Sequence, residues 1–266
     1  MNELRVSTVQ TELFWQDEQA NLSMLEAKLA PLAKQTDLIV LPEMFNSGFS
    51  MSPEKVAQPF EGVTLKWMIA QAKALESAIC GSIAINDNDK YRNRFIFVHP
   101  DGVVDSYDKR HCFRMSGEHE VYSAGNSKVV IEYKGWRILA QICYDLRFPV
   151  FARNQFDKEN SRHEYDLMIN VANWPEPRRN PWRTLAQARA VENLAYVVAV
   201  NRVGQDDNGN QYSGDSLVVD YQGDLIFDHQ RLTAVQTSTL DLQNLMRFRE
   251  KFPAWLDADE FTLNLS

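Results

Sequence analysis

The sequence predicts an α/β protein in which two mixed β-sheets pack together with helices on the outside. Three observations predict this fold class. Strand-like and helix-like stretches alternate over about the first 76 residues, closely spaced strand-like runs follow, and a strand–helix–strand unit occupies residues 166–204. The chain has 266 residues, of which 44% are apolar, and this is enough to fill a sizeable core.

The N-terminal part reads as two successive strand–helix pairs. Residues 4–11 alternate as a strand does, and residues 16–34 carry leucines three and four positions apart, as an amphipathic helix would. Residues 36–43 form a short continuous apolar run that is typical of a strand buried on both faces. Residues 64–76 again have helical spacing.

Strands dominate the rest of the chain, with one further helix at about residues 181–193. The expected strands are residues 77–85, 94–98, 102–107, 128–133, 136–143, 166–174, 194–204, 216–220 and 224–229. Turns are expected at residues 100–102, at Lys134-Gly135 and at residues 221–223.

No internal repeat, low-complexity tract or linker interrupts the sequence, so we expect a single domain over residues 1–266. Residues from about 243 to 266 are expected to form a short helix and an arm rich in Phe, Trp and Leu. This arm would either cover the core or reach a neighbouring subunit.

Composition excludes several classes of partner. The net charge is −8 and no basic run or aromatic-basic pattern occurs, which argues against nucleic acid or an anionic membrane as a partner. No stretch of about eighteen apolar residues predicts a membrane span, and the N-terminus lacks the features of a signal peptide, so we expect a cytoplasmic protein. Cys80, Cys112 and Cys143 form no C-x-x-C pair, which argues against a disulfide framework or a zinc site.

Three expected strands end on reactive side chains, and ligands of α/β proteins gather at the carboxyl ends of strands. These side chains are the carboxylate of Glu43, the ammonium of Lys109 and the thiol of Cys143. If the three strands are neighbours, the groups converge at one rim. Cys143 is then an exposed nucleophile at a strand end rather than a buried packing residue, which is the commoner fate of a cysteine.

Each of these residue types has a task in acyl transfer. A cysteine attacks a carbonyl or nitrile carbon as the thiolate, and a nearby carboxylate, here Glu43, accepts its proton and returns it to the leaving amine. Lys109 and the backbone N–H of Tyr144 are candidates to stabilise the negative charge that forms on the substrate oxygen. A buried lysine beside one titrating carboxylate needs a second carboxylate, and spacing allows either Glu118 or Glu120 to supply it.

The segments LPEMFNSGF (41–49), YDKRH (107–111) and ICYDLRFP (142–149) resemble, in this order, the three signature motifs of the nitrilase superfamily of carbon–nitrogen hydrolases. This resemblance, which covers nearly the whole chain, implies a four-layer αββα sandwich. It also implies that Glu43 is the general base, Lys109 the stabiliser of the tetrahedral intermediate and Cys143 the nucleophile. Through the segment EHEVYSAG it favours Glu118 as the second glutamate.

Within the superfamily the chain most resembles the omega-amidases, through LPEMFNSGF, EHEVYSAG and NVANWP. That branch hydrolyses 2-oxoglutaramate and 2-oxosuccinamate to the 2-oxo dicarboxylate and ammonia through a cysteine thioester. The resemblance implies a small-molecule amide substrate, no metal or organic cofactor, and a homodimer.

Further residues are expected around the pocket. Tyr144 and Trp174 are predicted to line it, although aromatic residues in such positions are at least as often core. A substrate carboxylate favours an arginine. Five arginines lie in suitable loops or helix starts, and spacing does not choose among them: Arg114, Arg147, Arg178, Arg179 and Arg183. We take Arg147 as the candidate.

Two other features are interpreted as structural. Cys112 is expected to be a packed thiol. Arg189 and Glu192 lie three positions apart on one helix face and are expected to pair there.

Three rival functions remain open at this point. One is another nitrilase-superfamily activity, on a nitrile, an aliphatic amide or an N-carbamoyl amide. A second is a papain-like cysteine hydrolase, for which His111 or His119 would be the base. The third is a catalytically silent scaffold, in which all three cysteines would react slowly and equally with a thiol reagent.

Overall fold

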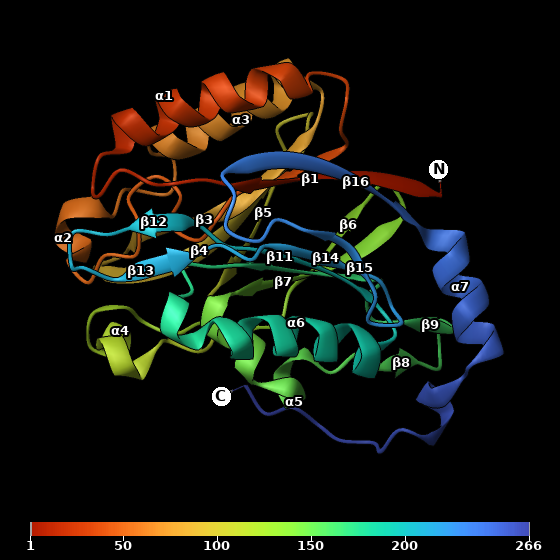
Figure 1. The fold of residues 1–266 in the computed structure, drawn as a ribbon. Helices are drawn as coiled ribbons and strands as arrows, with labels where there is room; N and C mark the ends of the chain where they lie inside the picture. Colours follow the sequence, from red (N-terminus) through yellow and green to blue (C-terminus); the bar gives the residue numbers. More distant parts are fainter. Residues whose placement is uncertain (1, 266) are drawn as a thin grey trace.

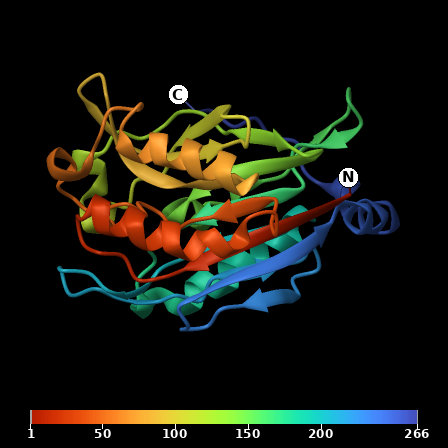
Figure 2. The same ribbon diagram turned by 90° about the horizontal axis from the view of Figure 1, so that it is seen from above.

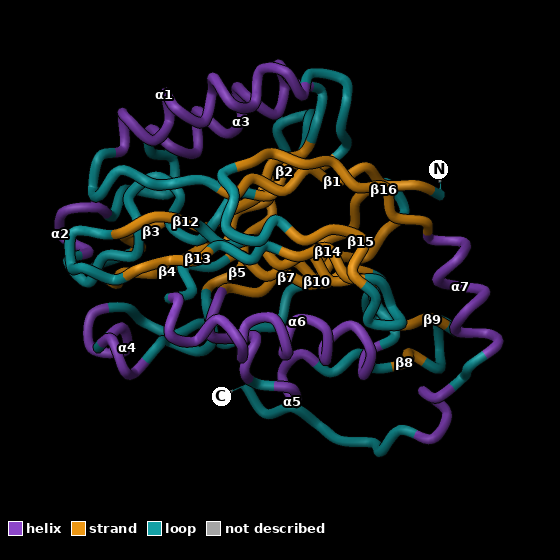
Figure 3. The backbone as a smooth tube through the Cα atoms, in the orientation of Figure 1, coloured by secondary structure: helices purple, strands orange, loops and turns teal. Residues whose placement is uncertain are grey.

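The computed structural model describes residues 2–265, so Met1 and Ser266, the ends of the predicted domain, lie outside the described residues. Two six-stranded sheets lie face to face, and helices cover both outer faces (Figures 1 and 3). This confirms the predicted class of two mixed sheets with flanking helices and gives the four layers of an αββα sandwich.

The first sheet contains the N-terminal strands in the order β16-β1-β2-β3-β4-β5. Its strands are β16 (Ala234–Asp241), β1 (Glu3–Gln10), β2 (Leu38–Val40), β3 (Ala78–Asp87), β4 (Lys90–Val98) and β5 (Val104–Asp108). β1, β2 and β3 are parallel, whereas β4 runs antiparallel to both β3 and β5. As a result β2 and β5 point the same way, and their carboxyl ends lie at the same edge of the sheet.

The second sheet has the order β15-β14-β11-β10-β7-β6. Its strands are β15 (Leu225–Asp228), β14 (Leu217–Val219), β11 (Tyr196–Val200), β10 (Leu167–Val171), β7 (Trp136–Ile142) and β6 (Val130–Tyr133). β7, β10 and β11 are parallel. The β6–β7 hairpin turns at Lys134-Gly135, where both residues have positive φ angles, as a two-residue hairpin turn requires.

Helices form the outer layers. They are α1 (Glu18–Leu29), α2 (Pro53–Val56), α3 (Val63–Leu75), α4 (Glu118–Val121), α5 (Pro149–Ala152), α6 (Arg179–Asn193) and α7 (Leu242–Lys251). Seen from above, α1 and α3 lie side by side over the first sheet (Figure 2). α6 packs against β11 and β14 on the outer face of the second sheet.

Sequence patterns account for the helix positions. The Asp17 side chain accepts a hydrogen bond from Ala20 N at 2.9 Å and so caps the start of α1. The leucines that predicted α1 form its buried stripe, and α3 ends at Glu76, which has a left-handed conformation. One large apolar cluster fills the space between the sheets and beneath α6, and a second lies between the first sheet and helices α1 and α3.

Some boundaries differ from the sequence prediction. The strand expected at 194–204 is interrupted at Asn201 and Arg202, and its last residues form β12 (Val203–Gln205), which pairs with β13 (Gln211–Ser213). The edge strand β16 was not predicted, although it alternates as AVQTSTLD. A short hairpin of β8 (Phe156–Asp157) and β9 (Arg162–His163) was also missed.

The C-terminal arm covers its own chain. After α7 a turn at Ala254–Asp257 places Trp255 against Phe156, with ring centroids 3.8 Å apart. The chain then runs back below α6 towards α5 (Figure 1), and Leu263 and Leu265 pack against the large core cluster. Of the two roles expected for this arm, the structure therefore shows the one that covers the core. Among residues 2–265, no helix is both long and apolar enough to cross a bilayer.

Candidate active site

The predicted reactive residues meet where the two sheets face each other. Glu43 lies just beyond β2, Lys109 directly follows β5, and Cys143 directly follows β7 of the other sheet. Convergence does not require the three strands to be neighbours, the condition considered from sequence: β3 and β4 separate β2 from β5, and β7 belongs to the second sheet. The groups converge because the two sheets bring their carboxyl-terminal edges together.

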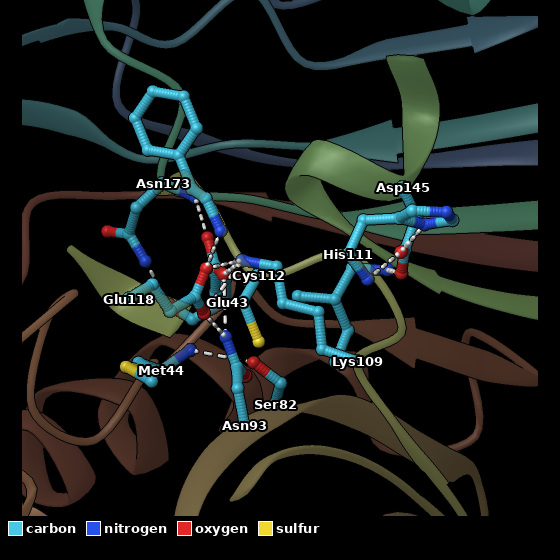
Figure 4. A network of polar contacts seen from close by, with 12 residues as sticks. Glu43, Met44, Ser82, Asn93, Lys109, His111, Cys112, Glu118, Asp145 and Asn173 are labelled. Atoms are coloured by element: carbon cyan, nitrogen blue, oxygen red, sulfur yellow. Dashed lines mark hydrogen bonds and ion pairs between the residues drawn. The ribbon is translucent and has the colours of Figure 1, made fainter. Parts of the chain in front are cut away.

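A buried ion cluster forms the centre of the site (Figure 4). Lys109 Nζ lies 2.8 Å from Glu43 Oε1 and 3.0 and 2.9 Å from the two oxygens of Glu118. All three side chains are at most 1% exposed. The ammonium thus donates to two carboxylates in surroundings from which water is excluded, where charge interactions are strong.

The structure chooses between Glu118 and Glu120. Glu118 is the first residue of the short helix α4, and Phe113 N donates to its Oε2 at 2.5 Å. The side chain of Glu120 points outward and is 73% exposed. Only Glu118 therefore reaches Lys109.

Two asparagines that were not predicted hold the carboxylates in place. Asn93 Nδ2 donates to Glu43 Oε1 at 2.8 Å and to Glu118 Oε1 at 3.2 Å. Asn173 N donates to Glu43 Oε2 at 2.7 Å, and Asn173 Nδ2 donates to the Glu43 carbonyl oxygen. Their positions in the sequence could have indicated them, because each is a polar residue within or directly after an apolar strand. Asn93 lies in RNRFIFV, and Asn173 lies in NVANW.

Cys143 differs from expectation in its exposure. It is only 7% exposed, so the prediction of an exposed nucleophile was wrong. Its φ of 46° lies in the left-handed region, where a residue with a Cβ is strained by about 1–2 kcal/mol. This conformation turns the chain sharply from β7 into the single 3₁₀ turn Cys143–Arg147.

The thiol of Cys143 is neutral at rest. Burial, followed by the charge of Glu43, raises the pKa of Cys143 well above its usual value, and Lys109 only partly opposes this effect. Attack by this sulfur therefore requires a base that removes its proton during the reaction, and Glu43 is the residue whose charge most strongly affects the thiol.

The charges of Lys109 and Glu118 depend on each other. Burial alone lowers the pKa of Lys109, but Glu118 and Glu43 outweigh burial and hold that pKa well above its usual value. Burial raises the pKa of Glu118, and the ammonium of Lys109 opposes that rise. Lys109 therefore stays cationic at neutral pH.

A cavity of about 650 Å³ is lined by Cys143 and by Asn173, which binds Glu43 of the ion cluster. The predicted pocket residues Tyr144, Trp174 and Arg147 all line it. A somewhat larger cavity of about 720 Å³ lies beside the C-terminal arm, but no reactive group described above lines it. The 650 Å³ cavity is therefore the candidate substrate pocket.

The structure divides the five candidate arginines for binding a substrate carboxylate into those that line the pocket and those that do not. Arg147 and Arg178 line the pocket and form no ion pair with any of the described residues, and their guanidinium groups lie over Trp174 and Phe113 at 5.5 and 5.2 Å. The remaining three do not line it: Arg179 and Arg183 bind Asp215, and Arg114 points to solvent.

The remaining predicted residues are structural or peripheral. Cys112 packs in an apolar cluster, with its Sγ 3.7 Å from the Tyr122 carbonyl oxygen. Arg189 and Glu192 pair at 2.9 Å, as expected. The ring of His111 faces Asp145, and the side chain of His119 is 31% exposed.

Among residues 2–265 no group of three or more His, Cys, Asp or Glu side chains has an arrangement that could hold a metal ion. The side chains at the site suit acyl transfer, because a thiol, a nearby carboxylate and a fixed ammonium are the groups that this chemistry uses.

Comparison with known proteins agrees with the acyl-transfer chemistry inferred from the site. Residues 5–250 match the family model for carbon–nitrogen hydrolases. The chain is 46% identical to the omega-amidase YafV of Yersinia enterocolitica over 99% of this chain and 100% of that one. It is 29% identical to the 2-oxoglutaramate amidase of Bacillus subtilis (strain 168), over 95% of this chain and 96% of that one.

A solved structure supports the fold. The crystal structure of a carbon–nitrogen hydrolase superfamily protein from Xanthomonas campestris, with an arsenic adduct in its active site, superposes with a TM-score of 0.97. That protein is 45% identical to this chain, and the match covers 99% of this chain and 100% of the other. The family match over most of the sequence, together with this similarity, shows that the chain belongs to the carbon–nitrogen hydrolase family.

Proposed function

We propose that this protein is an omega-amidase that hydrolyses the terminal amide of 2-oxo acid monoamides, such as 2-oxoglutaramate and 2-oxosuccinamate, to the dicarboxylate and ammonia. The observation that carries the proposal is the buried contact of Lys109 with Glu43 and Glu118 beside Cys143, at a pocket with an unpaired arginine in its wall. Full-length similarity to the omega-amidase YafV supports the choice of substrate class.

The first half of the reaction forms a thioester. Glu43 accepts the proton of Cys143 while the sulfur attacks the amide carbon, and the carbonyl electrons move onto oxygen. Lys109 Nζ and the backbone N–H of Tyr144 donate hydrogen bonds to this oxyanion. When the intermediate collapses, the C–N bond breaks and Glu43 returns the proton to the departing ammonia.

The second half releases the acid. Glu43 takes a proton from water as the water oxygen attacks the thioester carbon, and the same donors stabilise the second oxyanion. Collapse breaks the C–S bond, and the proton held by Glu43 returns to Cys143. The enzyme returns to its resting state, in which the raised pKa of Cys143 keeps the thiol protonated.

Glu118 allows Glu43 to change its protonation state. When Glu43 is protonated, Lys109 would lose its only counter-charge if no second carboxylate were present, and a buried unpaired ammonium is costly. Glu118 lies within 3.0 Å of Nζ through both oxygens and keeps Lys109 charged throughout the cycle.

We assign Arg147, Tyr144 and Trp174 to substrate binding. The guanidinium of Arg147 packs over the Trp174 ring and has no carboxylate partner among residues 2–265, so it is available for the carboxylate at the far end of a 2-oxo acid amide.

We also infer a cytoplasmic homodimer. All three cysteines are free of disulfides, which fits the reducing cytoplasm. The outer helices α5 and α6 expose Val150 and Val191, which would give a second copy an apolar surface to contact.

The direct test is ammonia release by the purified protein from 2-oxoglutaramate, glutamine, an aliphatic amide, an N-carbamoyl amide and a nitrile. We expect kcat/KM for 2-oxoglutaramate to exceed that for the uncharged aliphatic amide and the uncharged nitrile by about 100-fold or more, because a pocket built to pair a charged group rejects substrates that lack it. Faster turnover of another compound in the series would keep the reaction type and reject the substrate. No turnover of any compound would favour the silent scaffold.

Arg147→Gln should weaken the binding of 2-oxoglutaramate. Losing a charge-assisted hydrogen bond to the substrate carboxylate costs about 1.5–3 kcal/mol, so kcat/KM should fall about 10- to 100-fold, with much smaller change for an uncharged amide. Steady-state kinetics on both substrates would measure this, with the exposed Arg114→Gln as the matched control. A larger loss in Arg178→Gln than in Arg147→Gln would move the carboxylate site to Arg178.

A further inference from the structure

Asp145, two residues beyond Cys143, is a buried carboxylate that the reaction above does not use. It is completely buried and pairs with no Lys or Arg among the described residues. Four donors satisfy it instead. Oδ1 accepts from His111 N at 3.0 Å and from His111 Nδ1 at 2.7 Å, and Oδ2 accepts from Tyr107 OH at 2.8 Å and from Ile142 N at 3.0 Å.

These donors come from the two segments that carry the reacting groups. Tyr107 and His111 lie on either side of Lys109, at the end of the first sheet. Ile142 directly precedes Cys143, at the end of the second sheet. A single carboxylate thus joins the backbone beside the ammonium to the backbone beside the thiol.

Further contacts make this junction rigid. Tyr107 OH, besides donating to Asp145, accepts a hydrogen bond from Arg110 N at 2.9 Å. The imidazole of His111 stacks on Phe148 with ring centroids 3.9 Å apart and an interplanar angle of 11°. Asp145 also accepts a hydrogen bond from Ile142 N, the backbone amide directly before Cys143. This bond holds the Asp145 side chain next to the left-handed backbone conformation of Cys143.

His111 cannot at the same time serve as the base for Cys143 through Nδ1. A carboxylate only accepts hydrogen bonds, so the Nδ1 that lies 2.7 Å from Asp145 carries a hydrogen and donates it. In Figure 4 the His111 ring points to Asp145 and away from the group formed by Glu43, Lys109 and Glu118. Only Nε2 of His111 is then free to act as a base, so a papain-like mechanism would need Nε2 to reach Cys143, and no such contact is seen among residues 2–265.

We propose that Tyr107, His111 and Asp145 are positioning residues that fix Lys109 Nζ relative to Cys143 Sγ across the interface of the two sheets. Without them the ammonium would no longer lie where the oxyanion develops, and oxyanion stabilisation depends on donors placed in advance. The inference rests on the proposed roles of Cys143 and Lys109, but it does not depend on which amide is the substrate.

The test uses His111→Phe, which keeps an aromatic ring next to Phe148 but removes the donor to Asp145. We expect kcat to fall about 10- to 100-fold with KM changed less than about threefold, because small displacements of reacting groups cost rates of this order. The rate of alkylation of Cys143 by iodoacetamide, followed by mass spectrometry, should fall by a similar factor. Tyr107→Phe removes a different donor to the same carboxylate and should act in the same direction.

A conservative variant separates positioning from other roles. The Nδ2 of asparagine can occupy the place of His111 Nδ1, so His111→Asn should restore kcat to within about fivefold of wild type. If His111 were the base, His111→Asn would be as inactive as His111→Phe. That result would overturn the proposal.

The chain contains a matched control for loss of a histidine–aspartate pair. His99 Nε2 lies 2.8 Å from Asp105 Oδ2, and this pair occupies the opposite end of the β4–β5 hairpin from Lys109. His99→Phe should leave both kcat and alkylation of Cys143 near wild type, even if both phenylalanine variants lower the unfolding temperature.

The remaining outcomes are also decisive. A His111→Phe variant with kcat and alkylation rate within twofold of wild type would overturn the proposal, whatever its stability. If the wild type does not hydrolyse 2-oxoglutaramate, the alkylation rates still compare the variants, so failure of the substrate assignment is distinguishable from failure of the positioning role.

Discussion

Cys143→Ala should abolish amide hydrolysis, with kcat/KM falling by about 10⁴-fold or more, because the proposed mechanism offers no other group to form the thioester. The variant should still fold, since it removes only one sulfur atom, and the free energy of unfolding should change by no more than about 1–2 kcal/mol. Ammonia release measures the activity. Substrate binding by calorimetry shows that the pocket is intact.

Cys112→Ala is the matched control for this experiment. Cys112 is a packed thiol whose pKa burial raises to about 11, and it does not line the substrate pocket. Its removal should leave kcat within about twofold of wild type. Turnover by Cys143→Ala would contradict the assignment of the nucleophile. The same would follow if mass spectrometry of rapidly quenched wild type found the acyl group of the substrate on Cys80 or Cys112.

Glu43→Gln should lower kcat by about 10³- to 10⁴-fold. Glutamine has nearly the shape of glutamate, but it cannot take the proton of the thiol, and the raised pKa of Cys143 keeps that proton on the sulfur at rest. General acid–base catalysis by one side chain is worth about 10²- to 10⁴-fold, and Glu43 acts in both halves of the reaction. Stopped or continuous ammonia assays at saturating substrate measure the effect.

The pH dependence of this variant has a definite sign. Burial is the largest cause of the raised pKa of Cys143, and it persists when Glu43 is neutral. The residual rate therefore depends on the small fraction of thiolate, which increases about tenfold per pH unit below the pKa of the thiol. The residual kcat/KM should still be rising at pH 9, whereas wild type uses Glu43 as the base and should not show this rise across neutral pH.

Glu120→Gln is the matched control for the glutamate, because Glu120 is exposed and lies outside the ion cluster. It should retain the wild-type rate. If Glu43→Gln were active and His111→Phe were completely inactive, the base would be the histidine and the proposed mechanism would be wrong.

Much of the fold was predictable because its signals are local. The leucine stripe of α1, the continuous apolar run of β2 and the Lys134-Gly135 turn of the β6–β7 hairpin each depend on a few adjacent residues. The edge strand β16 was missed because its residues are mostly polar, and it becomes a strand by pairing with β1 across more than 220 residues of chain.

The sequence by itself determined the fold class, the order of most of the strands and helices, and the choice of Glu43, Lys109 and Cys143 as candidate reactive groups at strand ends. Only the tertiary structure decided that these ends meet across two sheets, that Glu118 rather than Glu120 reaches Lys109, and that Asn93, Asn173 and Asp145 hold the site together. The physical reason is that burial and hydrogen bonding depend on neighbours that are distant in the chain. Lys109 lies 66 residues from Glu43, and Asn173 lies 130 residues from it. The same long-range surroundings exclude water from Cys143 and keep its thiol neutral, which no local pattern records.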